Sequence, residues 1–181
     1  NDCELVAVSL SKVEDKLETT LKNLGSLKED EARARDQLFE IKGIINNSKY
    51  KIKDYDLPRI PEQFYIEMKE AYDAVKEINK ELDKKPISIK TLNLRVETAG
   101  DLALKLFKTA TNTTKTAAMA EMAIVYGNRY RSSNSEVEAG LIKATKAFNR
   151  GNYKDSLEII LNALNIVEPG IHKKLLSKME S

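Results

Sequence analysis

Tryptophan is absent from the sequence, and cysteine and histidine occur once each. The lone cysteine, Cys3, has no partner for an internal disulfide, so the chain does not require an oxidising compartment. One cysteine and one histidine, His172, are also too few for a zinc site of the usual ligand types. Four prolines, seven glycines and an aromatic content of 6% leave few turns and few bulky core residues. This composition favours long helices over a many-stranded sheet.

Neither sign of charge dominates, because 30 basic and 28 acidic residues leave a formal net charge of +2. This balance gives no electrostatic case for nucleic acid or for an anionic membrane surface as a partner. The most apolar stretch, residues 117–126, is too short to span a bilayer and includes Glu121. The chain opens at Asn1 without a signal peptide or an anchor, so we expect it to be a piece of a longer protein.

The residue types that usually carry catalysis do not come together in the sequence. The glycines are scattered and are never spaced as in a phosphate-binding loop. His172 lies in a basic segment, where a lone histidine is more often a surface residue than a general base. Acidic neighbours such as Glu136 and Glu138 lie among many other charges, so we expect them on solvated faces. The sequence therefore predicts a protein that is not an enzyme and that uses no cofactor or metal.

The first segment of the chain, residues 6–45, carries the repeat of a coiled coil, with apolar residues at alternating steps of three and four positions that only Thr20 and Glu31 interrupt. These residues are Val6, Leu10, Val13, Leu17, Leu24, Leu27, Ala34, Leu38, Ile41 and Ile45. They predict one helix from Leu5 to Ile45, which the polar segment Asn46-Asn47-Ser48 ends. A second helix is predicted from Pro61 to Leu82, because proline suits the first turn of a helix.

A third and longer helix is predicted after Pro86, because no proline follows until Pro169. Its apolar line is rich in alanine, and small residues let neighbouring helices approach closely. We expect this helix to run to Arg131. The threonine-rich segment 109–116 has low helix propensity, and a break there is the alternative.

Two shorter helices are predicted near the carboxy terminus. Ser135 and Glu138 match the S-x-x-E capping box, so we expect a helix to begin there. A corner at Gly151-Asn152 separates it from a last full helix over residues 153–167, and residues 171–181 follow as a basic tail. Small and aromatic residues of this pair sit at offsets similar to those of a tetratricopeptide hairpin. We interpret the pair as a helical corner, since an independent array of such repeats needs about three of them.

These patterns predict an all-α protein. Three helices joined in this way suggest a triple-helical bundle that resembles a spectrin repeat, and the third helix is too long for one such bundle. We therefore expect elongated, serial antiparallel three-helix bundles that share the long helix and end in a helical hairpin. The predicted domains are a spectrin-like bundle over residues 1–115, a second bundle over 116–170 and the basic tail over 171–181.

The segment over residues 124–132 combines tyrosine, arginine and glycine near a predicted helix end. Tyrosine and arginine dominate the energetics of many protein interfaces, and a glycine inside a helix is costly unless another backbone lies close. The candidate protein-interaction patch consists of Tyr126, Asn128, Arg129, Tyr130 and Arg131. The alternative is a fraying helix end whose arginines suit the helix dipole.

The same segment carries a resemblance to a known family. Residues 126–132, YGNRYRS, together with Lys146-Ala147-Phe148 and Val167-Glu168-Pro169-Gly170, are similar to the septation ring formation regulator family, EzrA, of low-GC Gram-positive bacteria. The match covers the last third of the chain, which thus resembles the carboxy-terminal portion of the cytoplasmic domain of a staphylococcal EzrA. The family has a patch named for Gln, Asn and Arg and tied to septal placement. Asn128 and Arg129 match this patch, whereas Val125 stands where its glutamine is expected.

The resemblance implies spectrin-like repeats in the cytoplasm, an amino-terminal transmembrane anchor outside this sequence, and a role in regulating FtsZ ring assembly. We therefore expect a non-enzymatic regulator and scaffold of cell division that contacts FtsZ and other division proteins. Its expected place is the cytoplasmic face of the membrane at the septum, with no nucleic-acid partner and with self-association left open. The alternatives are a passive spacer and a single tetratricopeptide-like module that binds peptides.

Overall fold

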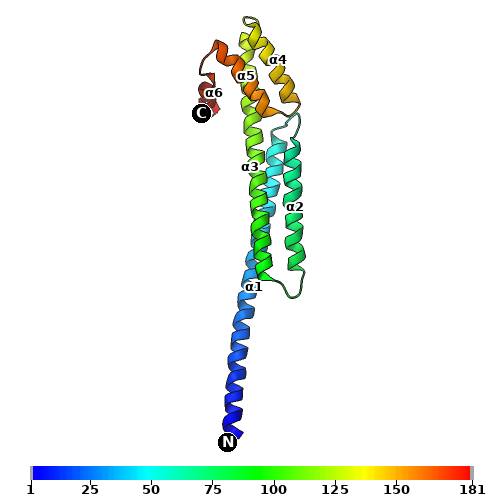
Figure 1. Ribbon diagram of the computed structural model, residues 1–181, viewed down its shortest axis with the longest axis vertical. Coiled ribbons are helices and arrows are strands. Elements are labelled where there is room, and N and C mark those ends of the chain that lie inside the picture. Colours follow the sequence, from blue (N-terminus) through cyan, green and yellow to red (C-terminus); the bar gives the residue numbers. More distant parts are fainter. Residues whose placement is uncertain (1, 180–181) are drawn as a thin grey trace. The chain divides into compact units, whose positions relative to one another are not determined.

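The computed structural model describes the backbone of residues 2–179 and the side-chain environments of residues 11–175 and 177. Every regular element within residues 2–179 is helical (Figure 1), which confirms the predicted all-α class. The elements are α1 (Asp2–Asp54), α2 (Glu62–Leu82), α3 (Ile89–Gly127), the 3₁₀ turn η1 (Asn128–Tyr130), α4 (Ser135–Asn149), α5 (Tyr153–Val167) and α6 (Ile171–Met179). Cys3 and the predicted seam positions Val6 and Leu10 lie outside the residues with described side chains.

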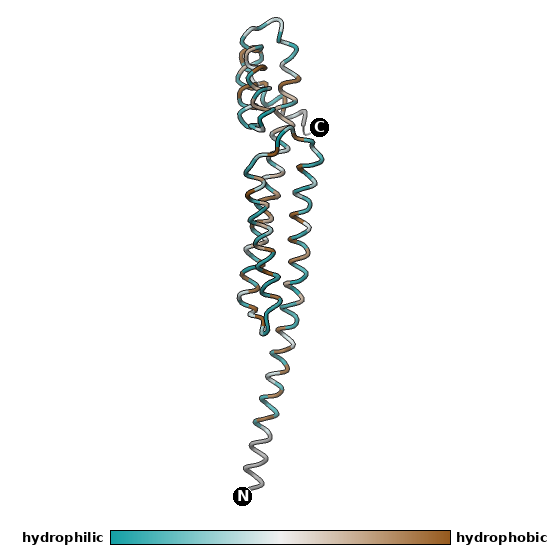
Figure 2. Tube along the Cα trace, turned by 90° about the vertical axis from the view of Figure 1, so that its right-hand side faces the viewer, coloured by the Kyte–Doolittle hydropathy of each residue, from teal (hydrophilic) through white to brown (hydrophobic). Residues whose placement is uncertain are grey.

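Hydrophobic residues recur along the long helices with hydrophilic residues between them (Figure 2), as amphipathic helices require. The chain divides into two compact units. The first comprises residues 1–42 and 72–101, and the second comprises residues 43–71 and 102–181. The predicted boundary at residues 115 and 116, the serial order of bundles and the elongated shape stay predictions.

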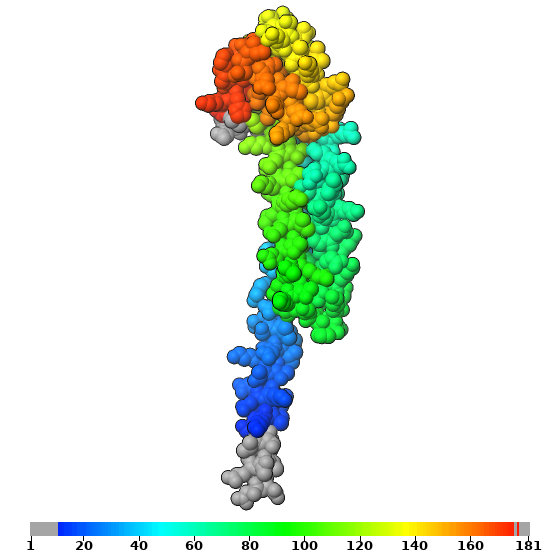
Figure 3. Space-filling model, viewed as in Figure 1, coloured from blue at the N-terminus to red at the C-terminus, as the bar shows by residue number. Residues whose placement is uncertain are grey.

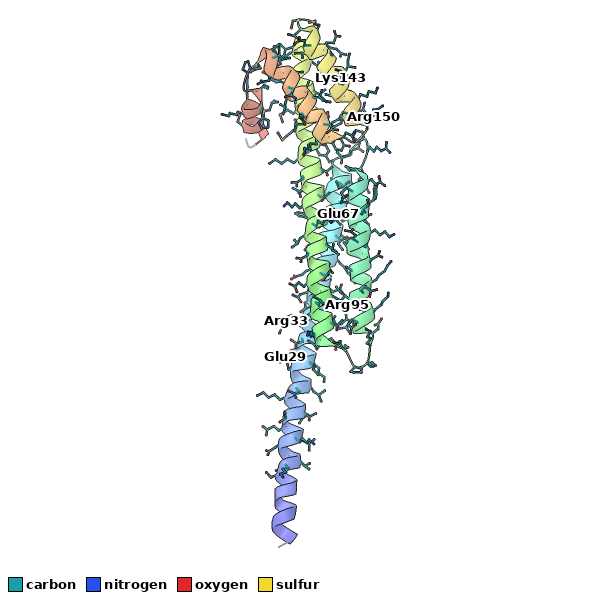
Figure 4. All side chains as sticks on the ribbon, in the orientation of Figure 1. Glu29, Arg33, Glu67, Arg95, Lys143 and Arg150 are labelled. Atoms are coloured by element: carbon teal, nitrogen blue, oxygen red, sulfur yellow. The ribbon has the colours of Figure 1, made fainter. Side chains whose placement is uncertain are left out.

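The core of the first unit is formed by apolar lines on α1, α2 and α3. Its buried residues, each at most 8% exposed, are Ala34, Leu38, Ile41, Val75, Ile78, Leu82, Leu92, Val96 and Ala99. Ala34, Leu38 and Ile41 occupy positions on the predicted seam of the first helix, so the periodicity located this part of the core correctly. Beside it, the Arg95 guanidinium donates to the backbone carbonyl of Glu77 and lies 3.8 Å from the buried Glu81 carboxylate (Figure 4). A hydrogen bond from Lys84 holds the pKa of Glu81 below its usual value.

The amino-terminal part of the α1 seam is exposed in the described chain. All of residues 11–29 are exposed, and the predicted seam residues Leu17 and Leu24 are 57% and 49% exposed. Figure 3 shows this stretch, in blue, standing clear of the other segments of its unit. Within the described residues, the seam is therefore buried only from Ala34 onward.

In the second unit, α1 does not end at its Asn-Asn-Ser segment, as predicted, but continues to Asp54. Ile45 and Ile52, seven residues apart, are 1% and 2% exposed, so the apolar line runs on through the polar segment. Ser48 is fully buried between them, and its hydroxyl donates to the backbone carbonyl of Ile44 at 2.8 Å. Burial of the two isoleucines outweighs the low helix propensity that predicted an end.

α3 runs without a break through its threonine-rich segment, so the alternative of a break there is wrong. Ala110 and Thr114 are buried, and the Thr114 hydroxyl donates to the carbonyl of Ala110 at 3.1 Å. The predicted end of this helix at Arg131 is also wrong, because α3 ends at Gly127. The chain tightens there into η1, where the Arg131 N–H donates to the carbonyl of Asn128.

α4 begins at Ser135, as predicted, but Ser135 is not its cap. The side chain of Asn134 accepts hydrogen bonds from the backbone N–H groups of Glu136 and Val137, each at 3.0 Å. An asparagine at this position satisfies amides that the first turn of a helix leaves without a partner. The predicted corner after α4 is confirmed, since Gly151 has a φ of 84°, in the left-handed region.

α4 and α5 approach each other closely through small residues. A Cβ atom at Gly140 would lie 2.4 Å from the Cβ atom of Ala163. The buried hydroxyl of Ser156 donates to the carbonyl of Ala144 at 2.8 Å. Tyr153, at the start of α5, anchors the α4–α5 hairpin to the linker between α1 and α2. Its hydroxyl donates to the carbonyl of Arg59 at 2.6 Å.

Residues 171–179 form α6 instead of the predicted tail. Ile171 and Leu175 are 1% and 3% exposed and pack with residues of α3, α4 and α5. Lys173 stays exposed on the outer side. Two aliphatic residues four positions apart share one face of a helix, and burying that face stabilises the short helix.

Candidate functional site

The predicted patch lies where α3 ends and meets the three last helices. Beneath it is an apolar cluster formed by Ala123, Tyr126, Val137, Leu141, Ala144, Ile160, Leu164, Ile171 and Leu175. Gly127 lies against this cluster, and a Cβ atom there would be 3.1 Å from Leu141 and 3.2 Å from Ile160. The glycine therefore matches the close approach that its place in a helix indicated.

Tyr126 and Tyr130 meet at one carboxylate, that of Glu168 after α5. The Tyr126 hydroxyl donates to Glu168 Oε2, and the Tyr130 hydroxyl donates to the same oxygen at 3.2 Å. Lys174 of α6 donates to Glu168 Oε1 at 2.6 Å and to the Tyr126 hydroxyl oxygen at 3.3 Å. This tyrosine–carboxylate network joins α3, η1, the end of α5 and α6.

Charge stabilises this network. The hydrogen bond from the Lys174 ammonium, followed by those from Tyr126 and Tyr130, lowers the pKa of Glu168 to about 2. The hydrogen bond to Glu168 in turn raises the pKa of Lys174 above its ordinary value. Both groups are therefore charged near neutral pH, and the ion pair between them holds α6 beside the end of α5.

Arg129 is positioned by the ring of Tyr126. Its guanidinium carbon lies 3.8 Å from the ring centroid, a cation–π contact that contributes about 0.5–1 kcal/mol at an exposed site. Arg129 itself is exposed, whereas Tyr126 is only 7% exposed. The buried ring of Tyr126 thus holds the exposed side chain of Arg129 in place at the surface.

Asn128 and Arg131 line a groove between the end of α3, η1 and α4, with a volume of about 690 Å³. The lining residues are Ile124, Asn128, Arg131, Leu141, Ile142, Thr145, Lys146, Asn149 and Arg150. Arg131 Nε also lies 3.8 Å from Glu138 Oε1, but a pair with both side chains about half exposed is worth little. The predicted patch therefore divides: Tyr126, Arg129 and Tyr130 belong to the network, and the other two residues belong to the groove.

Four charged residues of the network and the groove were not among the predicted site residues: Lys146, Arg150, Glu168 and Lys174. Lys146 and Glu168 lie within the segments that carried the family resemblance, so a sequence signal for them existed. Arg150 and Lys174 had no such signal, since only the packing of α4 and α6 brings them here. Val125, at the position where the family's glutamine is expected, is 66% exposed.

Some charged residues are paired along single helices, as Lys80 and Glu77 are at 2.6 Å. In the described part of the chain, His, Cys, Asp and Glu side chains form no group of three or more that could hold a metal ion. Among the described residues, no helix combines the length and the apolar character needed to cross a membrane.

The fold and this surface define an all-helical bundle protein whose last helices hold aromatic and charged residues in one ordered network. The family model described as Septation ring formation regulator, EzrA, matches residues 1–179. The chain therefore belongs to the EzrA family, which confirms the resemblance found in its sequence. The match extends beyond the last third of the chain, where the quoted motifs lie.

Several curated relatives carry the same description. The septation ring formation regulator EzrA of Staphylococcus epidermidis strain RP62A is 32% identical over 166 residues, which are 92% of this chain and 29% of the relative. Those of Streptococcus sanguinis strain SK36 and Listeria monocytogenes serotype 4b strain CLIP80459 are each 29% identical over 99% of this chain and 31% of the relative. The chain thus spans less than a third of the length of these relatives. No solved structure matches the chain significantly.

Proposed function

We propose that this chain is part of a non-enzymatic regulator and scaffold of bacterial cell division. It contacts FtsZ and modulates the assembly and positioning of the septal ring at the cytoplasmic face of the membrane. Membership of the EzrA family supports the division role. The observation that carries the contact is the exposed Arg129, which stacks on the buried ring of Tyr126. The exposed Asn128 lies directly before it in the chain, and no residue of η1 is buried.

The geometry favours binding because Arg129 is held in place before a partner arrives. The Tyr126 ring carries Arg129, and the hydroxyl of the same ring donates to Glu168. A side chain that is already ordered loses less conformational entropy on association than a mobile one. Arginine is also among the residue types that dominate binding energies.

An FtsZ sedimentation assay tests the proposal. The full 181-residue chain is added to purified FtsZ with GTP, and the sedimented fraction of FtsZ is measured. We expect the chain to change that fraction. The variant Asn128→Ala with Arg129→Ala should need roughly tenfold more protein for the same effect, as loss of an arginine anchor implies.

The matched control is Arg33→Ala, which removes a 67% exposed arginine of α1 (Figure 4) and should act like the unaltered chain. A chain without effect on FtsZ sedimentation, or a double variant as active as the control, contradicts the proposal. The passive spacer and the single tetratricopeptide-like module both predict no effect on FtsZ. The same assay therefore separates the proposed function from these two alternatives.

A further inference from the structure

The groove beside the predicted patch has an apolar floor. Leu141 is 2% exposed, Ile124 is half-buried and Ile142 is 56% exposed. An exposed isoleucine leaves aliphatic surface in contact with water, and covering it with another apolar side chain is favourable. The volume of about 690 Å³ lies within the range of ligand-binding clefts, so the groove is large enough for side chains of a partner.

The remaining lining gives the groove one sign of charge. Arg131, Lys146 and Arg150 contribute basic groups, and none of the lining residues is acidic. Within the described residues, Lys146 and Arg150 form no ion pair. Arg131 lies 3.8 Å from the carboxylate of Glu138. Lys146 and Arg150 are therefore available to an anionic partner.

We propose that this groove binds an acidic peptide segment that carries aliphatic side chains. Its aliphatic side chains cover Ile142 and Ile124, and its carboxylates pair with Lys146 and Arg150. The amides of Asn128 and Asn149 each offer a donor and an acceptor to the peptide backbone. A concave site with an apolar floor and polar amides suits a peptide better than a flat anionic lipid surface.

This inference rests on the proposed function in one respect, namely that the end of α3 belongs to a protein-binding surface. It deepens that function by naming the class of segment that the groove takes. The test uses no FtsZ, so its outcome is separate from that of the sedimentation assay. Peptide binding without an effect on FtsZ removes the proposed function and leaves the groove as a site for another partner.

The test measures fluorescence anisotropy of short labelled acidic peptides mixed with the full 181-residue chain. Each peptide carries two leucines among Asp and Glu residues, at spacings of one, two, three or four positions. Two matched peptides accompany each of them, one with serine for leucine and one with lysine for the acidic residues. We expect saturable binding by at least one leucine-containing acidic peptide, with the matched peptides binding at least about tenfold more weakly.

Charge-reversal variants test whether the peptide binds in the groove. Lys146→Glu with Arg150→Glu should weaken binding at least about tenfold, because both basic groups become repulsive. Lys143→Glu is the matched control, since Lys143 is exposed on the same helix and does not line the groove (Figure 4). A second variant, Ile142→Ser, removes an exposed aliphatic group and should weaken binding with little change in melting temperature.

Several results would overturn the inference. These are no saturable binding by any acidic peptide, equal binding of the serine-containing peptides, and unchanged binding by the Lys146 and Arg150 double variant. Binding to vesicles of anionic lipid that the double variant abolishes, with no peptide bound, assigns the groove to a membrane surface and also overturns it. Circular dichroism melting of each variant shows that a loss of binding does not arise from unfolding.

Discussion

The hydroxyl of Tyr126 donates a hydrogen bond to the carboxylate of Glu168, a residue 42 positions further along the chain. This bond ties the end of α3 to the segment that leads into α6, and it fixes the ring on which Arg129 stacks. We expect Tyr126→Phe to lower the melting temperature of the chain and to loosen Arg129. Tyr65→Phe, at a 49% exposed tyrosine of α2, should leave the melting temperature unchanged. Equal melting temperatures for the two variants would show that the hydrogen bond is unimportant.

The pH dependence of stability should report on the same carboxylate. The pKa of Glu168 is about 2 in the folded chain, against an ordinary value of 4.5. Because the folded value is depressed, the stabilisation is fully present above pH 4.5 and is lost as the pH falls towards 2. We expect Glu168→Gln to melt at a lower temperature than the unaltered chain at neutral pH. The difference should shrink between pH 4.5 and pH 2, and a constant difference across that interval would contradict the charged network.

The closeness of α4 and α5 predicts the effect of a single methyl group. Gly140→Ala would place its Cβ atom 2.4 Å from the Cβ atom of Ala163, so the helices must shift. We expect a loss of about 1–3 kcal/mol in the free energy of unfolding, as for other overpacked cores. Gly43→Ala is the control in the same unit, because no atom lies within 4 Å of the added Cβ. Denaturant titration should show Gly43→Ala unchanged or stabilised, and a similar result for Gly140→Ala would refute the close approach.

Substitution of Leu175 tests whether the last segment is a helix packed on the core or a tail. Leu175 is 3% exposed, and Leu→Ala changes in cores cost about 2–5 kcal/mol. We expect Leu175→Ala to destabilise the second unit and to increase amide hydrogen exchange in α6. Lys173→Ala, at an exposed position of the same helix, should change neither quantity. If Leu175→Ala behaves like Lys173→Ala, α6 contributes nothing to the fold.

The double variant Asn128→Ala with Arg129→Ala tests the patch in cells. Both residues are exposed, and the cation–π interaction between Arg129 and the Tyr126 ring is worth only about 0.5–1 kcal/mol. We therefore expect the melting temperature to stay nearly unchanged while septal localisation of the full-length protein is lost. Normal localisation of a stable variant would refute the patch. A collapse in melting temperature would instead assign the two residues to the fold.

The helices of this protein were predictable where apolar residues repeat over many turns. Ala34, Leu38 and Ile41 on α1 are buried as their spacing predicts. The prediction was wrong at the end of α1, where burial of Ile52 carries the helix past a polar segment. The position of a helix end depends on a few weak local preferences. Burial of one side chain in the tertiary structure is enough to outweigh them.

The candidate site was predictable only in part. The sequence placed Tyr126 and Tyr130 together in the candidate patch, and both donate to Glu168. The spacing did not indicate that Arg129 and Arg131 serve different features, one stacked on a ring and the other lining a groove. That separation arises because the chain tightens into η1 after Gly127, which changes the direction of successive side chains.

The sequence by itself determined the all-α class and the family. Periodic apolar lines and short motifs are local properties of the sequence, so they can be recognised without knowing which residues are in contact. The tertiary structure decided which part of the α1 seam is covered, that Ile171 and Leu175 dock, and that Lys146 and Arg150 border one groove. These features depend on contacts between residues far apart in the chain. Such contacts leave no periodic signal in the sequence. Each is stabilised by the burial of side chains and by the proximity of charged groups, and both arise only when the helices have packed.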